Sequence, residues 1–94
     1  MALLLCHLKC EDYTRWRAAF DAHTPIRQAA GCKGSHMFQA ASDPNEVWIT
    51  LTFDDQATAQ ALLGRPDVQQ AIKESGVIGD VEVHMIEDAG RNPG

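Results

Sequence analysis

The sequence has neither a long hydrophobic run nor a cluster of basic residues. Its N-terminal apolar stretch, residues 3–9, is far shorter than the roughly 20 apolar residues of a membrane-spanning helix. Eight Lys and Arg stand against 13 Asp and Glu, which gives a formal net charge of −5. We therefore expect no membrane partner and no nucleic-acid partner, and we expect the protein to be cytoplasmic.

The sequence has only three cysteines. Cys6, Cys10 and Cys32 make an odd number, and without a secretory signal they are expected to be reduced thiols rather than a disulfide framework. The stretch Cys6-His7-x-x-Cys10 resembles a metal or redox motif. However, neighbours in a strand point to opposite faces, and Cys6 and Cys10 would lie roughly 13 Å apart in a continuous strand. We therefore predict no metal and no cofactor from this motif.

The order of the remaining segments predicts an α+β fold. Strand-like segments are expected at residues 3–9, 33–42, 46–53 and 80–87, and helical segments at 13–30, 55–63 and 66–76. Pro25 should kink or break the first helix near residues 21–24, and residues 42–45 should form a tight hairpin turn. The order is that of a ferredoxin-like βαββαβ domain with an antiparallel sheet. We expect residues 1–88 to form this single domain and residues 89–94 to be a flexible C-terminal tail.

Residues 47–53 alternate so cleanly that the strand must have two unlike faces. Val47, Ile49, Leu51 and Phe53 share one face, and Trp48 lies on the other. Both helical regions should cover the same side of the sheet, so the face with Trp48 lacks cover within one chain. We predict that a second sheet packs on it, giving a homodimeric α+β barrel.

Three groups of residues carry a resemblance to a known family. They are His7-x-Lys9 before Asp12-Tyr13-x-x-Trp16, then Phe20-Asp21-x-His23 with Arg27-x-x-Ala30-Gly31, and Asp43-Pro44-Asn45-Glu46-Val47. Over residues 3–87 the sequence resembles the dimeric α+β barrel superfamily, and within it the small antibiotic-biosynthesis-monooxygenase-like and cyclase-like proteins. The resemblance implies a ligand cavity between the sheet and the helices of each protomer, and a dimer made by sheet-on-sheet packing.

The departures from that family shape the functional hypothesis. Its cofactor-free quinone-forming monooxygenases use an asparagine and a tryptophan in the cavity, but the only asparagines here are Asn45 and Asn92. Its haem-degrading members take a histidine ligand from the second helical region, and residues 55–76 contain no histidine. We therefore predict a cofactor-independent enzyme that cyclises or isomerises a hydrophobic, carbonyl-bearing, polyketide-like small molecule. A cofactor-free monooxygenase and a non-catalytic ligand-binding barrel are the alternatives.

The predicted catalytic residues are His7, His23 and Arg27. A histidine titrates near neutral pH and can abstract a proton beside a carbonyl, and a guanidinium can hold the negative charge that develops. If the face with the leucines and cysteines packs on the helices, His7 is expected to point into the cavity. His23 lies on the helical stripe of Trp16 and Phe20, with Arg27 one turn later. The plainer interpretation is a hydrogen-bonded or surface histidine, with Arg27 in an ordinary ion pair.

Six further side chains are predicted to bind the substrate: Trp48, Thr50, Thr52, His36, Phe38 and His84. A dimer interface is an equally good interpretation for Trp48, Thr50 and Thr52, and an exposed rim is the alternative for His84. Which face of residues 33–42 points inward is left open. A metal site assembled by His7, His36 and His84 from separate strands is the alternative to the absence of metal.

Overall fold

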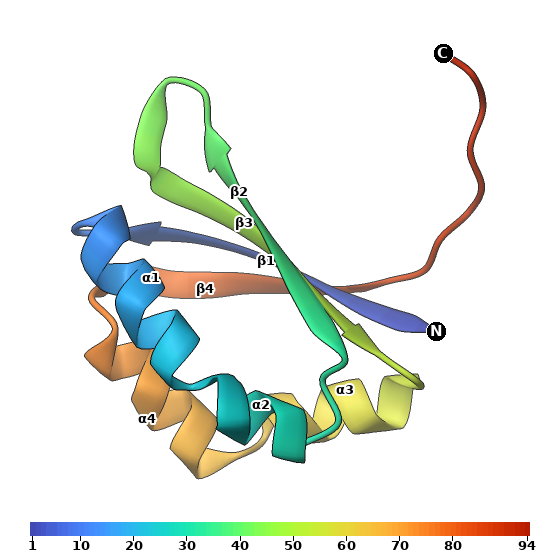
Figure 1. Ribbon diagram of the computed structural model, residues 1–94, viewed down its shortest axis with the longest axis horizontal. Coiled ribbons are helices and arrows are strands. Elements are labelled where there is room, and N and C mark those ends of the chain that lie inside the picture. The colour runs from blue at the N-terminus through green and yellow to red at the C-terminus, as the bar shows by residue number, and fades with distance from the viewer.

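Four antiparallel strands form one sheet in the computed structural model, which describes residues 1–94. The strands are β1 (Ala2–Cys10), β2 (Gly34–Ala40), β3 (Asp43–Phe53) and β4 (Val77–Ile86), in the order β2-β3-β1-β4. The helices are α1 (Tyr13–Ala22), α2 (Thr24–Ala29), α3 (Gln56–Leu63) and α4 (Pro66–Glu74). All four helices lie on one side of the sheet (Figure 1). The ferredoxin-like α+β fold is thus confirmed, and none of its helices has the length and apolar character needed to cross a membrane.

The helix starts follow from local chemistry. The Asp12 side chain caps α1 by accepting a hydrogen bond from the backbone N–H of Arg15 at 3.2 Å. Pro25 lies in the first turn of α2, where its missing N–H is tolerated, and the helix breaks at His23 as predicted. This break places His23 at the junction of α1 and α2.

The predicted hairpin turn at residues 42–45 is wrong in position. The turn is formed by Ala41 and Ser42, and β3 already begins at Asp43. Pro44 is accommodated inside the strand because the register between β2 and β3 shifts between Gln39 and Ala40. Such irregularities are where a strand tolerates a residue without an N–H.

The core lies between the sheet and the helices. The even residues of β1 are buried, and they pair with the buried residues of β3: Leu4 with Leu51, Cys6 with Ile49, and Leu8 with Val47. The opposite surface of the sheet is called the open face below. It carries Leu3, Leu5, His7, His36, Phe38, Glu46, Trp48, Thr50, Thr52, Glu82 and His84. Beyond β4, residues 87–94 form neither helix nor strand and lead away from the sheet (Figure 1).

Candidate functional site

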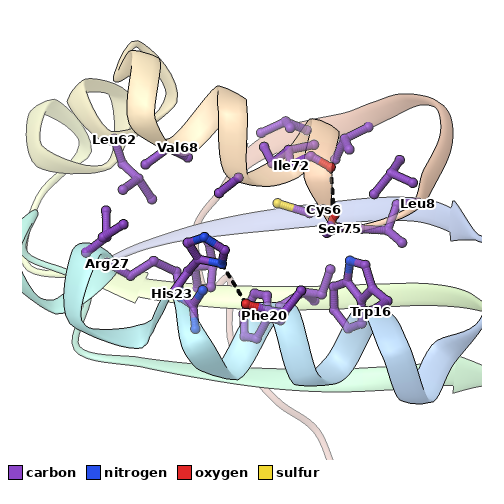
Figure 2. Close-up of a pocket in the computed structure, with 18 of the residues that line it drawn as sticks. Cys6, Leu8, Trp16, Phe20, His23, Arg27, Leu62, Val68, Ile72 and Ser75 are labelled. Atoms are coloured by element: carbon purple, nitrogen blue, oxygen red, sulfur yellow. Dashed lines mark hydrogen bonds between the residues drawn. The ribbon is translucent and has the colours of Figure 1, made fainter.

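A cavity of about 110 Å³ lies between the helix-covered face of the sheet and the helices (Figure 2). Of the 19 residues that line it, 16 are hydrophobic, and they come from β1, β3, β4 and all four helices. The volume approaches that of an engineered cavity of about 150 Å³ that holds benzene. The cavity therefore suits a small apolar molecule or the ring portion of a larger one.

Aromatic side chains of α1 form one wall. Trp16 is only 3% exposed, and its ring centroid lies 5.1 Å from that of Phe20. Tyr13 also packs on Trp16, with ring centroids 5.8 Å apart and the rings tilted by 38°. These spacings are typical of favourable aromatic pairs, and Trp16 and Phe20 give the cavity an aromatic wall.

Three polar residues interrupt the apolar lining: His23, Arg27 and Ser75. Figure 2 shows His23 and Arg27 on the helix side of the cavity and Ser75 near Cys6. The expectation that His23 and Arg27 lie together at a ligand cavity between sheet and helices agrees with this geometry. Their chemical roles stay predictions.

The hydrogen bonding of His23 determines which of its nitrogens is available. Nδ1 lies 2.6 Å from the carbonyl oxygen of Ala19 (dashed in Figure 2). Because a carbonyl oxygen only accepts, Nδ1 carries the proton of the neutral ring, and Nε2 keeps its lone pair. This arrangement leaves Nε2 able to act as a base.

Arg27 has no carboxylate partner. Its guanidinium carbon lies 3.6 Å from the centre of the Phe20 ring, and its Nη2 donates to Thr24 Oγ1 at 3.2 Å. Asp21, the nearest acidic residue in the sequence, is paired with Arg17 at 3.0 Å instead. Burial lowers the pKa of Arg27, because few groups around the guanidinium compensate its lost hydration. Its charge is therefore available to an anionic group in the cavity.

Ser75 was missed by sequence reasoning. It is 7% exposed, caps the C-terminus of α4, and donates from Oγ to the carbonyl oxygen of Ile72 at 2.6 Å. The Oγ lone pairs remain able to accept a hydrogen bond from a ligand. The available signal was a small polar residue between an amphipathic helix and Gly76, a pattern shared by many helix ends.

The expectation that His7 points into the cavity is wrong. The leucine and cysteine side of β1 does pack on the helices, but the cavity lies between that side and the helices. His7 therefore projects from the open face, where its ring stacks on Trp48 with centroids 4.4 Å apart. The structure separates His7 from His23 and Arg27 by the thickness of the sheet.

The six predicted substrate-binding residues also lie on the open face. Strand pairing brings His36 opposite Thr50, and Phe38 opposite Trp48. His84 pairs with Leu5 on β1, so its side chain is on the same face. None of these six side chains lines the cavity between the sheet and the helices. Their role in substrate binding stays a prediction, and the open face is the side on which the alternative dimer interface of Trp48, Thr50 and Thr52 would lie. The sequence left open which side chains of β2 face the helices. Met37 pairs with the buried Ile49 and faces the helices, so His36 and Phe38 lie on the open face.

The side chains that usually bind metals do not converge on one point. No group of three or more His, Cys, Asp and Glu side chains is placed to hold a metal ion. All three cysteines are free and buried, and burial raises the pKa of Cys6 to about 11. Because the thiolate is the reactive form, Cys6 behaves as a small apolar residue of the cavity wall.

Comparisons with known proteins agree with the fold. The family model described as antibiotic biosynthesis monooxygenase matches residues 7–74. A protein from Bordetella bronchiseptica described as an antibiotic biosynthesis monooxygenase superposes with a TM-score of 0.81 at 13% identity, covering 94% of this chain and 96% of that one. SnoaB, a cofactor-independent oxygenase from Streptomyces nogalater, superposes with a TM-score of 0.79 at 8% identity, covering 99% and 97%.

A third solved structure, Rv0793 from Mycobacterium tuberculosis, has a TM-score of 0.70 at 15% identity and covers 96% of each chain. At these identities the three likenesses establish the shared fold alone. No curated protein sequence matches the chain.

Proposed function

The chain belongs to the antibiotic biosynthesis monooxygenase family, and from that premise we propose that it is a cofactor-independent enzyme acting on a small, apolar, carbonyl-bearing molecule. One observation carries the proposal. His23, with a free Nε2, and Arg27, with no carboxylate partner, both line a cavity whose walls are otherwise almost entirely apolar. Base, cation and apolar walls are the requirements of proton abstraction beside a carbonyl.

In the proposed reaction, His23 Nε2 takes a proton from the carbon beside the carbonyl. The electron pair of that C–H bond moves to the carbonyl oxygen, and Arg27 stabilises the enolate that forms. The Ala19 carbonyl oxygen holds the Nδ1–H, which orients the ring and stabilises the imidazolium. The apolar walls keep water away, so the charge interaction between Arg27 and the enolate is strong.

The fate of the enolate defines the product. If a C=C bond adjoins the deprotonated carbon, the negative charge extends to a further carbon; when His23 returns the proton there, the double bond shifts and the substrate is isomerised. If the enolate carbon attacks a second carbonyl of the same molecule, a new C–C bond closes a ring, and the alkoxide takes the proton from His23. Both outcomes balance without an external oxidant, and we propose them as the reaction type.

Oxygenation is the second candidate, and family membership favours it. The same enolate would give electrons to O₂, form a hydroperoxide and lose water to leave a new carbonyl. Trp16 lines the cavity, but Asn45 does not: its side chain accepts from the Tyr13 backbone N–H at 2.9 Å and donates to the Glu11 carbonyl oxygen at 3.3 Å. The asparagine and tryptophan pair of the quinone-forming members is therefore only half present in the cavity, which favours proton transfer alone.

A non-catalytic binding barrel predicts a cavity that no titratable group reaches. The presence of His23 and Arg27 in the lining supports the enzyme over this alternative. We further propose that the chain works as a homodimer, because its open face leaves large side chains such as Phe38, 48% exposed, without cover in a single chain.

The experiment uses acetylacetone, a compact 1,3-diketone, as the probe. Exchange of its carbon-bound hydrogens in D₂O is followed by NMR with the wild type, His23→Gln and Arg27→Met, and oxygen uptake is recorded in parallel. We expect accelerated exchange only with the wild type and with the control Arg15→Met, which removes an exposed arginine of the same helix region. Exchange with His23→Gln as fast as with the wild type would contradict the proposal, and oxygen uptake that depends on His23 would assign the reaction to oxygenation.

A further inference from the structure

His7 bridges two carboxylates on the open face. Its Nε2 lies 3.0 Å from Oε1 of Glu46 on β3, and its Nδ1 lies 3.2 Å from Oε2 of Glu82 on β4. Ionised carboxylates only accept hydrogen bonds, so both ring nitrogens must donate. A neutral imidazole has one N–H, and the arrangement with two ionised carboxylates therefore requires His7 as an imidazolium.

No other cation of the open face is free to replace His7. Lys9 Nζ is paired with Asp43 Oδ2 at 3.5 Å, and His84 Nε2 reaches the second oxygen of Glu82 at 2.9 Å. His36 stacks on a phenylalanine of its own strand with ring centroids 4.2 Å apart. The charged and titratable groups near His7 thus come from all four strands: Lys9 on β1, His36 on β2, Asp43 and Glu46 on β3, and Glu82 and His84 on β4.

The surroundings of this cluster suit a second copy of the chain. The His7 ring lies nearly parallel to Trp48, at 11°, and the half-exposed Phe38 lies beside Trp48 on β2. The open face therefore combines flat aromatic surface with balanced positive and negative groups. In a two-fold symmetric contact each copy offers the other the same mixture, so the face is complementary to itself.

We infer that docking of a second copy on the open face is linked to a proton: the two sheets associate while His7 is an imidazolium and separate when it is neutral. Docking removes water from Glu46 and Glu82. With His7 protonated, each of its ring nitrogens donates to a carboxylate. With His7 neutral, one ring nitrogen turns a lone pair towards Glu46 or Glu82 in a dehydrated contact, and the two carboxylates lose the positive charge between them, while His84 still reaches only the second oxygen of Glu82. The inference rests on the homodimer proposed above and adds its regulation.

Sedimentation velocity of the full chain at a series of pH values between about 6 and 9 tests this linkage. We expect the dimer dissociation constant to rise about tenfold or more across that range. Dissociation of one dimer should release at most two protons, because each copy has one His7. His7→Gln should bind more weakly and show no such slope. Glu46→Gln should stay dimeric at high pH, because a neutral His7 can donate to Glu82 and accept from the new amide.

The possible results distinguish the proposed homodimer from its proposed dependence on the proton of His7. A monomer at every pH contradicts the homodimer and the inference together. A dimer of constant affinity leaves the homodimer standing and overturns the proton linkage. If the dissociation constant of His7→Gln still rises with pH, the proton belongs to another histidine and the inference is overturned. The inference is also overturned if Glu46→Gln shows the same pH dependence as the wild type. His23→Gln, the same substitution in the cavity, is the matched control and should keep the wild-type slope.

Discussion

His23 donates from its imidazole Nδ1 to the carbonyl oxygen of Ala19 across the last turn of α1, at 2.6 Å. The bond exists because Pro25 ends α1 at this point and leaves His23 at the helix junction. The same bond both orients the ring and specifies its tautomer.

Replacing His23 separates its structural role from its chemical one. His23→Gln can keep a donor for the Ala19 carbonyl oxygen, whereas His23→Leu cannot, so only the leucine variant should lose about 1 kcal/mol of unfolding free energy. Both variants lack the base, and turnover should fall about 10²-fold or more in each. Chemical denaturation and a turnover assay measure the two effects. A leucine variant with wild-type turnover would show that His23 only terminates the helix.

Replacing Arg27 should affect activity more than stability. Arg27→Met loses the contact with the Phe20 ring but no longer buries a charge, so the free energy of unfolding should change by less than about 1 kcal/mol. Turnover should fall about 10²- to 10³-fold as the stabilisation of the enolate is lost. Arg27→Lys restores the charge without the planar fork and should recover only part of the rate. Equal loss of turnover and of stability in Arg27→Met would point to a purely structural residue.

Protonation of His7 should stabilise the fold on the acid side of neutrality. The hydrogen bonds that His7 donates to the Glu82 and Glu46 carboxylates raise its pKa above the ordinary value of 6.5. A group whose folded-state pKa is raised contributes its full stabilisation below its unfolded value, and this contribution is lost as the pH rises through the folded pKa. The unfolding free energy of the wild type minus that of His7→Gln should therefore be larger at about pH 6 than at about pH 9. An NMR titration of His7 with a midpoint at or below 6.5 would contradict this.

Two glycines with different surroundings should respond oppositely to alanine. Gly31 has a φ of +97°, and a Cβ built there would lie 2.5 Å from Thr58 Cγ2, so Gly31→Ala should cost more than about 1 kcal/mol. Gly34, in β2, has no atom within 4 Å of an added Cβ and no positive φ. Gly34→Ala should therefore be neutral or stabilising by roughly 0.5 kcal/mol. Thermal unfolding of the two variants side by side tests the contrast.

Most of the fold could be predicted from local patterns. The alternation of Val47, Ile49, Leu51 and Phe53 specified one buried face, and all four are buried. Asp12 and Pro25 marked the helix start and the helix break because capping and the missing N–H act within a few residues. Pro44 was misread as part of a turn because a bulge, which depends on the partner strand, allowed it inside β3.

The site could be predicted only in part. His23 and Arg27 were found because helical spacing keeps residues four apart on one face, which is a property of the chain itself. His7 was assigned to the wrong side of the sheet because both faces of β1 carry leucines, and sequence does not say on which side the void lies.

Local patterns in the chain were enough to predict the order of the elements, the faces of the best-patterned strand, and the placement of His23 and Arg27 on one helical face, from which both reach the cavity. The packing of the elements was needed to show that the cavity lies on the helix side of the sheet and that His7, His36 and His84 lie on the opposite face. The physical reason is that the position of a void depends on how side chains from several elements fill the space between two layers. The gathering of distant histidines likewise depends on strand register, which is set by pairing across the sheet rather than by neighbours in the chain.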